Sequence, residues 1–252
     1  MVSLWEHWRS GNRNRGPRFD TVGGPSSYAV ELTKRYPQVS LTQEGAHTGT
    51  LRVNLSWRMR PSDLYDRPRR RISLRNPLEM LKPEPVNAHT QGMVNVDLDL
   101  ACMYELKDGS KGVVQPLGGL VGDMHDPPYV KLSGDDRFGS GSGETIYVNL
   151  DHADEIKRLL FFVYIYDGTP AFDRTHAIVT LVPSSGPHVE VGLDERAPEA
   201  RSCAVLMIEH DKNGNLVARR EVRYVYGFQA DLDRLYGWGM AWGRGYKSPS
   251  RR

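Results

Sequence analysis

The sequence predicts an all-β protein: an antiparallel β-sandwich with Greek-key connections and one or two short helices. Three observations support this prediction. Short segments that alternate apolar and polar residues recur along the chain, glycine-containing turns separate them, and helical patterns are scarce. With 252 residues, 39% of them hydrophobic and 25% charged, the chain is long enough to bury one substantial core.

Residues 30–57 supply the first expected strands. Segments 30–33 and 39–42 each alternate apolar and polar residues, and the stretch 34–37 ends in Pro37, which can turn the chain. These two segments therefore predict a hairpin. Residues 51–57 alternate in the same way and predict a third strand with one apolar and one polar face.

The rest of the chain supplies more strands, with clear turns between several of them. A strand at residues 94–106 is followed by the turn 107–109 and a short strand at 112–114. Asn213-Gly214 is the strongest hairpin signal in the chain. Further strands are expected at 146–150, 159–166, 177–182, 189–191, 204–209 and 216–226, with a helical turn at 153–157 and a short helix at 230–236.

Composition divides the chain into a sandwich and basic segments. Residues 1–27 form an arginine-rich tail without apolar periodicity, residues 28–246 the sandwich, and residues 247–252 a C-terminal tail. Within the sandwich, residues 58–93 are too rich in proline and arginine for central strands and predict a surface insertion. Residues 1–93 carry 15 Lys and Arg against 8 Asp and Glu, whereas the remainder carries 18 against 23. The basic segments favour solvated arginines in flexible stretches, with an anionic membrane surface as the alternative. They lack the interleaved aromatics that stack on bases, so a nucleic-acid partner is not expected.

The expected location is the cytoplasm, with the inner membrane face as a peripheral site of attachment. No run of about 18 apolar residues marks a transmembrane segment, and the first residues lack the apolar stretch of a secretory signal. Cys102 and Cys203 lie in apolar, strand-like segments, so we expect buried free thiols rather than a disulfide or a metal site.

A glycine-rich acidic loop at residues 134–144 is the most informative segment. Glycine at alternate positions, including Gly139 and Gly141, lets carbonyl oxygens turn inward toward one point. Asp135, Asp136 and Glu144 add carboxylates, and hard oxygen ligands of both kinds are what Ca²⁺ requires. On composition alone the loop predicts a calcium site, with an ordinary mobile turn as the equal alternative.

A second acidic feature lies in the expected strand at residues 94–106. Asp97 and Asp99 are two residues apart, so a strand places both carboxylates on one face, roughly 6.5–7 Å apart. Two like charges this close are unfavourable unless a cation or an arginine neutralises them. The aspartate pair and the glycine loop thus require the same kind of partner.

The order and spacing of these motifs resemble the TerD/TerA tellurium-resistance and stress-protein family over residues 28–246. The resemblance runs through 30–42, 53–57, 97–101, the loop at 134–144 and 172–174 to the hairpin at Asn213-Gly214. It implies a calcium-binding β-sandwich whose ligands are Asp97, Asp99, Asp135, Asp136 and Glu144, with carbonyl groups around Gly139 and Gly141. The family loop usually carries more acidic residues, but Ser140 and Ser142 stand between the glycines here, which predicts weaker calcium binding.

Three functions remain open on this basis. The resemblance implies a calcium-binding stress-response module that is not an enzyme, whose partners are other TerD-family proteins, a membrane-associated Ter complex or further copies of the chain. The alternative is a metal-independent scaffold that assembles with homologous sandwiches or an anionic membrane through its tail and insertion. An enzyme that uses Asp97 and Asp135 as an acid–base pair is favoured least, because paired carboxylates beside a glycine loop suit a hard cation.

Two further motifs have competing interpretations. Asp211 to Asn215 looks like part of an EF-hand loop, but its glycine is misplaced and the required glutamate is missing, so a hairpin turn is expected. The aromatic segment 236–242 is expected to close one end of the core, with an exposed docking patch as the alternative.

Overall fold

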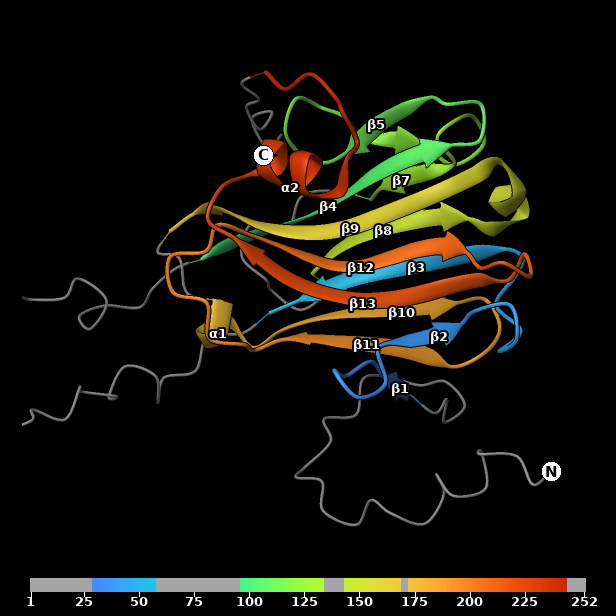
Figure 1. The fold of residues 1–252 in the computed structure, drawn as a ribbon, viewed down its shortest axis with the longest axis horizontal. Coiled ribbons are helices and arrows are strands. Elements are labelled where there is room, and N and C mark those ends of the chain that lie inside the picture. The colour runs from blue at the N-terminus through green and yellow to red at the C-terminus, as the bar shows by residue number, and fades with distance from the viewer. Residues whose placement is uncertain (1–28, 58–95, 134–142, 169–171, 244–252) are drawn as a thin grey trace, which may run out of the picture.

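The structure, a computed structural model, describes residues 29–57, 96–133, 143–168 and 172–243. These residues form two β-sheets that pack face to face, with few and short helices (Figure 1). The expected all-β sandwich is therefore confirmed. The tail 1–27, the insertion 58–93 and the tail 247–252 expected from the sequence lie outside the described residues.

The first sheet has seven strands in the order β1-β11-β10-β3-β8-β7-β6. The strands are β1 (Ala29–Glu31), β3 (Thr50–Ser56), β6 (Gly122–Asp123), β7 (Val130–Leu132), β8 (Glu144–Asn149), β10 (Ala177–Pro183) and β11 (His188–Leu193). All neighbours in this sheet run antiparallel except β1 and β11, which are parallel. The sheet is thus mixed at one edge.

The second sheet has six strands in the order β2-β13-β12-β9-β4-β5, and every neighbouring pair is antiparallel. The strands are β2 (Gln38–Ser40), β4 (Asp97–Leu106), β5 (Lys111–Val114), β9 (Ile156–Asp167), β12 (Ser202–His210) and β13 (Leu216–Val225). The turn with Asn213 and Gly214 joins β12 to β13, as predicted, and Gly214 supplies the positive φ of +81° that this turn needs.

The hairpin expected from residues 30–42 is wrong. β1 joins the seven-stranded sheet beside β11, whereas β2 joins the six-stranded sheet beside β13. The stretch between them therefore passes from one sheet to the other instead of reversing within one. Alternation identified two strands but could not tell which sheet each would enter.

The main core lies between the sheets and follows from strand alternation. On β4, Leu98, Leu100 and Cys102 all belong to this core and are fully buried. Burial of each such apolar side chain stabilises the fold by roughly 1.5–3 kcal/mol. Cys102 and Cys203 are free and buried, as expected, and burial raises the pKa of both thiols, which keeps them protonated.

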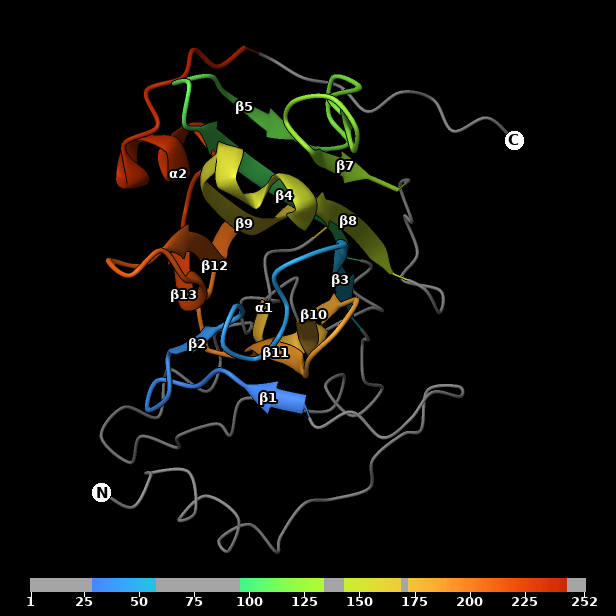
Figure 2. The ribbon, with the colours of Figure 1, turned by 90° about the vertical axis from the view of Figure 1, so that its right-hand side faces the viewer.

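A second apolar cluster covers the outer face of the six-stranded sheet. Met103 and Phe162, which point away from the main core, pack with Leu232 and Trp238 in this cluster. Leu232 belongs to helix α2 (Gln229–Tyr236), which Figure 2 shows outside the six-stranded sheet. The aromatic segment 236–242 therefore covers an outer sheet face and does not close one end of the core.

The remaining helices are short. The turn expected at residues 153–157 is a 3₁₀ helix, η5 (Leu150–Glu155), and α1 (Phe172–Thr175) was not expected. Within the described ranges, none of the helices has the length and apolar character needed to cross a membrane.

Candidate functional site

The acidic residues of β4 lie at the end of the sandwich where β4 and β8 begin and β9 ends (Figure 1). Asp97 is partly buried and stands opposite Asp167 of β9, with a register irregularity between Asp97 and Leu98. Asp99 is 0% exposed and stands opposite Tyr164. Two aspartates therefore face each other across neighbouring strands, and a third is buried two residues farther along β4.

Glu144 approaches the same end of β4 from the other sheet, but its side chain points between the sheets, whereas Asp99 lies on the outer face of its own sheet. Glu144 is the first residue of β8, is 0% exposed, and lies on the strand face that Ile146 and Val148 present to the main core. Its Oε2 accepts a hydrogen bond from the backbone N–H of Leu100, at 2.5 Å. This contact ties the seven-stranded sheet to the residue that follows Asp99.

A second contact between the sheets lies on the other side of the aspartates. The indole Nε1–H of Trp57, directly after β3, donates to the backbone carbonyl of Val96 at 3.2 Å. Val96 immediately precedes Asp97, and Leu100 immediately follows Asp99. The acidic segment 97–99 is thus bracketed by two hydrogen bonds from the opposite sheet.

The exit of the glycine-rich loop is fixed at Gly143. Its φ of +65° is a left-handed conformation, and a Cβ at this position would overlap the carbonyl oxygen of Leu55. Asn54 Nδ2 donates to the Glu144 carbonyl at 3.3 Å and to Thr145 Oγ1 at 2.9 Å. Backbone and side-chain contacts together therefore hold Glu144 in place.

The structure describes only part of the site that the sequence predicts. Asp97, Asp99 and Glu144 lie at one end of the molecule, with Asp99 and Glu144 on opposite faces of β4, while Asp135, Asp136, Gly139 and Gly141 lie outside the described residues. Across the described residues, no three His, Cys, Asp or Glu side chains gather closely enough to hold a metal ion. The described part alone does not complete an ion site.

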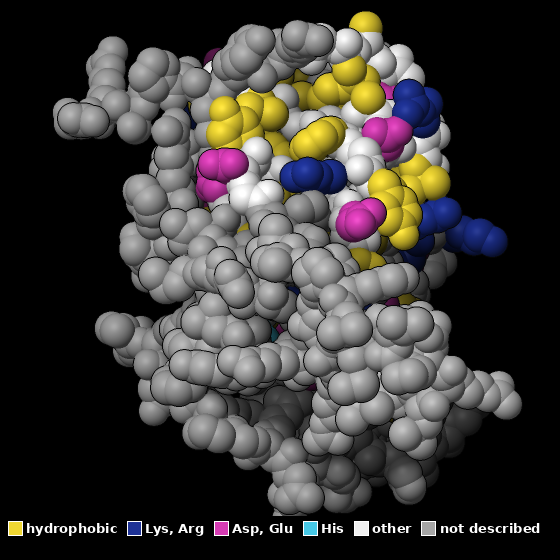
Figure 3. Space-filling view, turned by 90° about the vertical axis from the view of Figure 1, so that its left-hand side faces the viewer, with side chains coloured by type: hydrophobic (Ala, Val, Ile, Leu, Met, Phe, Trp, Pro, Cys, Tyr) yellow, Lys and Arg dark blue, Asp and Glu magenta, His cyan; other side chains and the backbone are white. Residues whose placement is uncertain are grey.

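Sequence reasoning missed Asp167 and Trp57 as parts of this end. Asp167 is the last residue of β9 and precedes Gly168, a pair that is typical of an ordinary turn. Its position opposite Asp97 depends on the strand register, which the sequence does not specify. Figure 3 views this side of the molecule, where hydrophobic side chains lie next to acidic and basic ones on the described surface. Tyr166, Tyr226 and Phe228 are among the exposed large hydrophobic residues.

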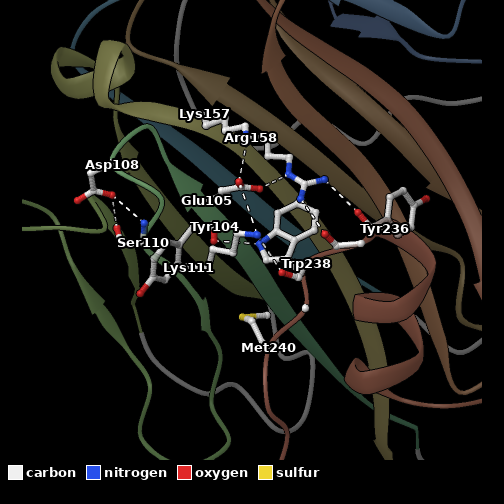
Figure 4. Close-up of polar contacts among 12 residues, drawn as sticks. Tyr104, Glu105, Asp108, Ser110, Lys111, Lys157, Arg158, Tyr236, Trp238 and Met240 are labelled. Atoms are coloured by element: carbon white, nitrogen blue, oxygen red, sulfur yellow. Dashed lines mark hydrogen bonds and ion pairs between the residues drawn. The ribbon is translucent and has the colours of Figure 1, made fainter.

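A second buried carboxylate, Glu105, lies near the other end of β4 (Figure 4). It is 4% exposed and accepts from Lys157 Nζ at 2.7 Å and Arg158 Nε at 2.6 Å, with Lys111 Nζ at 3.7 Å. Burial alone would raise the pKa of Glu105, but the hydrogen bonds from Lys157 and Arg158 and the nearby positive charges hold that pKa below its ordinary value. This carboxylate is neutralised by the protein itself.

Arg158 also anchors the C-terminal segment to the sheet (Figure 4). Its guanidinium lies 3.7 Å from the ring centroid of Trp238 and donates to the carbonyls of Tyr236 at 3.0 Å and Gly237 at 3.3 Å. Trp238 in turn donates from Nε1 to the Tyr104 carbonyl at 3.0 Å. These contacts give the Glu105 cluster a structural role.

Carboxylates at the turns serve a different purpose. Asp108, Asp123 and Asp211 each accept backbone N–H groups from their own turns. Hydrogen bonds from Ser110, His125 and Asn215, respectively, are the main reason that the pKa of each lies below its ordinary value. The segment beginning at Asp211 is a hairpin turn, as expected, and not an EF-hand.

The fold and this site define a class: a two-sheet β-sandwich with carboxylates buried at the exit of a glycine-rich loop. No family model matches the chain. Over 223 residues it is 34% identical to the tellurium resistance protein TerA of Alcaligenes sp., a match that covers 86% of this chain and 58% of that protein. The chain is a TerD/TerA-like protein, as its motifs predict, and it spans 58% of the length of this relative.

Two solved structures are also similar to the chain. SAV2460, a protein of unknown function, is 15% identical with a TM-score of 0.49, over 76% of this chain and 98% of its own. A homologue of the telluride resistance protein TerD, SCO6318 from Streptomyces coelicolor A3(2), is 20% identical with a TM-score of 0.47, over 73% and 95%.

Proposed function

We propose that this chain is a calcium-binding module with a role in tellurium resistance or the stress response. The ion would be held by Asp97 and Asp99 of β4 together with Asp135, Asp136 and carbonyl groups near Gly139 and Gly141. The observation that carries the proposal is the complete burial of Asp99 at the end of the sandwich where β8 begins. The likeness to TerA supports the resistance role.

Electrostatics supports a cation at this end. A buried carboxylate loses its hydration, which costs several kcal/mol unless another charge or a set of hydrogen bonds replaces it. Asp97 and Asp167 add to the negative charge because they face each other across β4 and β9. A hard divalent cation neutralises several carboxylates at once and accepts carbonyl ligands from a glycine loop.

The proposal assigns a binding role and no catalysis to the site. Calcium would order the loop and thereby a surface for other TerD-family proteins or a membrane-associated complex. Under this proposal the chain works in the cytoplasm, with its basic segments free to attach to the inner membrane face.

Calorimetric titration and thermal unfolding with calcium test the proposal, with magnesium as the comparison ion. We expect calcium to stabilise the chain by about 2.7 kcal/mol at a hundredfold excess over its dissociation constant. Asp99→Asn should abolish this response. Asp108→Asn, the same chemical change at an exposed turn, should leave it intact. The absence of both heat and stabilisation at millimolar calcium would defeat the metal-binding role.

A growth assay on tellurite tests the resistance role separately. A tellurite-sensitive host that expresses the native chain or the Asp108→Asn variant should survive better than one expressing Asp99→Asn. Equal survival with the native chain and both variants would show that resistance does not depend on calcium binding. If calcium has no effect but deletion of residues 1–27 abolishes attachment to anionic vesicles, the metal-independent scaffold replaces the calcium module.

A further inference from the structure

β4 has unequal neighbours on its two sides. β9 pairs with it from Asp97 to Leu106, whereas β5 pairs with it only from Cys102 to Glu105. On the β5 side, the stretch that contains Asp99 and Leu100 therefore extends beyond the paired region. Leu100 is fully buried, and a buried backbone N–H needs an acceptor.

Glu144 provides that acceptor from the opposite sheet. The 2.5 Å contact joins a carboxylate to a backbone amide in a fully buried environment, where charge-assisted hydrogen bonds are strong. The backbone of Glu144 is itself fixed by its pairing with Leu55 and by the Asn54 side chain. The side chain is thus held at both ends.

Trp57 completes the arrangement on the other side of the aspartates. Its indole and the Val96 carbonyl are joined in a buried setting. Between the two contacts lies the irregularity of register at Asp97 and Leu98. Such an irregularity re-aims side chains, and it keeps one geometry only when its surroundings hold it.

We propose that Trp57 and Glu144 are positioning residues for the acidic segment 97–99. Glu144 acts through the backbone of Leu100, with Oε2 committed to that amide instead of to an ion. The part of this proposal that concerns ion affinity rests on the calcium site proposed above. The part that concerns the backbone of β4 does not.

Conservative and truncating variants separate positioning from ligation. Glu144→Gln keeps an oxygen that can accept from Leu100 but removes the charge, whereas Glu144→Ala removes both. A positioning role predicts rescue by glutamine, with calcium affinity within about threefold of the native value, and a loss of about 10- to 100-fold in the alanine variant. A ligand role predicts that glutamine and alanine lose affinity alike.

Trp57→Phe removes the indole donor and keeps a large ring, so it tests the other contact. We expect calcium affinity to fall by about tenfold. Trp242→Phe is the matched control, because Trp242 also donates its indole N–H, to Asp233, in the segment that covers the outer sheet face. It should bind calcium like the native chain.

Hydrogen exchange at the Leu100 amide, measured without calcium, completes the experiment. The amide should be protected in the native chain and in Glu144→Gln, and should exchange faster in Glu144→Ala. Fast exchange in a folded Glu144→Gln variant would overturn the proposal even if the alanine variant does not fold. Equal losses of calcium affinity in the glutamine and alanine variants would overturn it while leaving the calcium site standing. A native chain that binds no calcium but shows the expected exchange pattern would refute only the calcium site.

Discussion

β4 has one buried carboxylate near each of its ends, and the strand register places a different kind of residue opposite each of them. Glu105 stands opposite Arg158 on β9, whereas Asp99 stands opposite Tyr164. Both are at most 4% exposed and lie on the same face of the strand. Neighbouring strands supply the countercharge for Glu105, whereas the residue directly opposite Asp99 is a tyrosine. A buried acid is therefore informative only once the register shows what faces it.

The largest expected effect tests the compensated end. Glu105→Ala leaves Lys111, Lys157 and Arg158 around a missing charge, and removing one partner of a buried ion pair typically costs about 3–5 kcal/mol. Urea unfolding should show this loss in the free energy of unfolding. A loss below about 1 kcal/mol would mean that the cluster is only a surface ion pair.

A pair of glycine variants compares the two ends of the sandwich. Gly143→Ala introduces a Cβ that overlaps the Leu55 carbonyl at a positive φ, and we expect a loss of about 3 kcal/mol. Gly214→Ala, in the β12–β13 turn, also has a positive φ but open space around the new Cβ, so about 1 kcal/mol is expected. Thermal unfolding of both variants is the measurement. Equal losses would show that the loop exit is no more tightly constrained than an ordinary turn.

The smallest effect is a pH dependence at Glu105. The folded-state pKa of this carboxyl is lowered, so its contribution to stability is present above the unfolded pKa of about 4.3 and is lost as pH falls through the folded value. The stability difference between the native chain and Glu105→Gln should therefore shrink between pH 6 and roughly pH 3. A difference that stays constant over this range would contradict the assigned cause.

Elements with local causes were predictable from the sequence. Leu51, Val53 and Leu55 alternate with polar residues, and β3 forms over Thr50–Ser56 with those three side chains buried. The β4–β5 and β12–β13 hairpins follow from alternating strands joined by tight turns. In each case strand and turn lie next to each other in the sequence, so the pattern contains the whole cause.

Features set by distant pairing were not predictable in this way. β1 and β2 read as a hairpin because nothing local distinguishes a turn within one sheet from a passage between two. β6 and β7 have only two and three residues, too few for a periodic signal. The Glu105 cluster and the Trp57–Val96 contact depend on register and on sheet packing, which local patterns do not specify.

The candidate site lies between these two cases. Spacing placed Asp97 and Asp99 on one strand, and the family resemblance joined them to Glu144, which the structure brings to the same end. Neither line of reasoning indicated that one oxygen of Glu144 contacts a backbone amide. The ligand roles of Asp135, Asp136, Gly139 and Gly141 stay predictions.

The C-terminal cover of the six-stranded sheet has a consequence for protein synthesis. Every strand of both sheets has left the ribosome before Trp238 does, because the covering segment follows β13 in the chain. A nascent chain can therefore assemble its sandwich while Met103, Phe162 and their neighbours still face water. During that interval the outer face is an exposed hydrophobic surface. A chaperone or another incomplete chain can bind to it before Trp238 packs against Arg158.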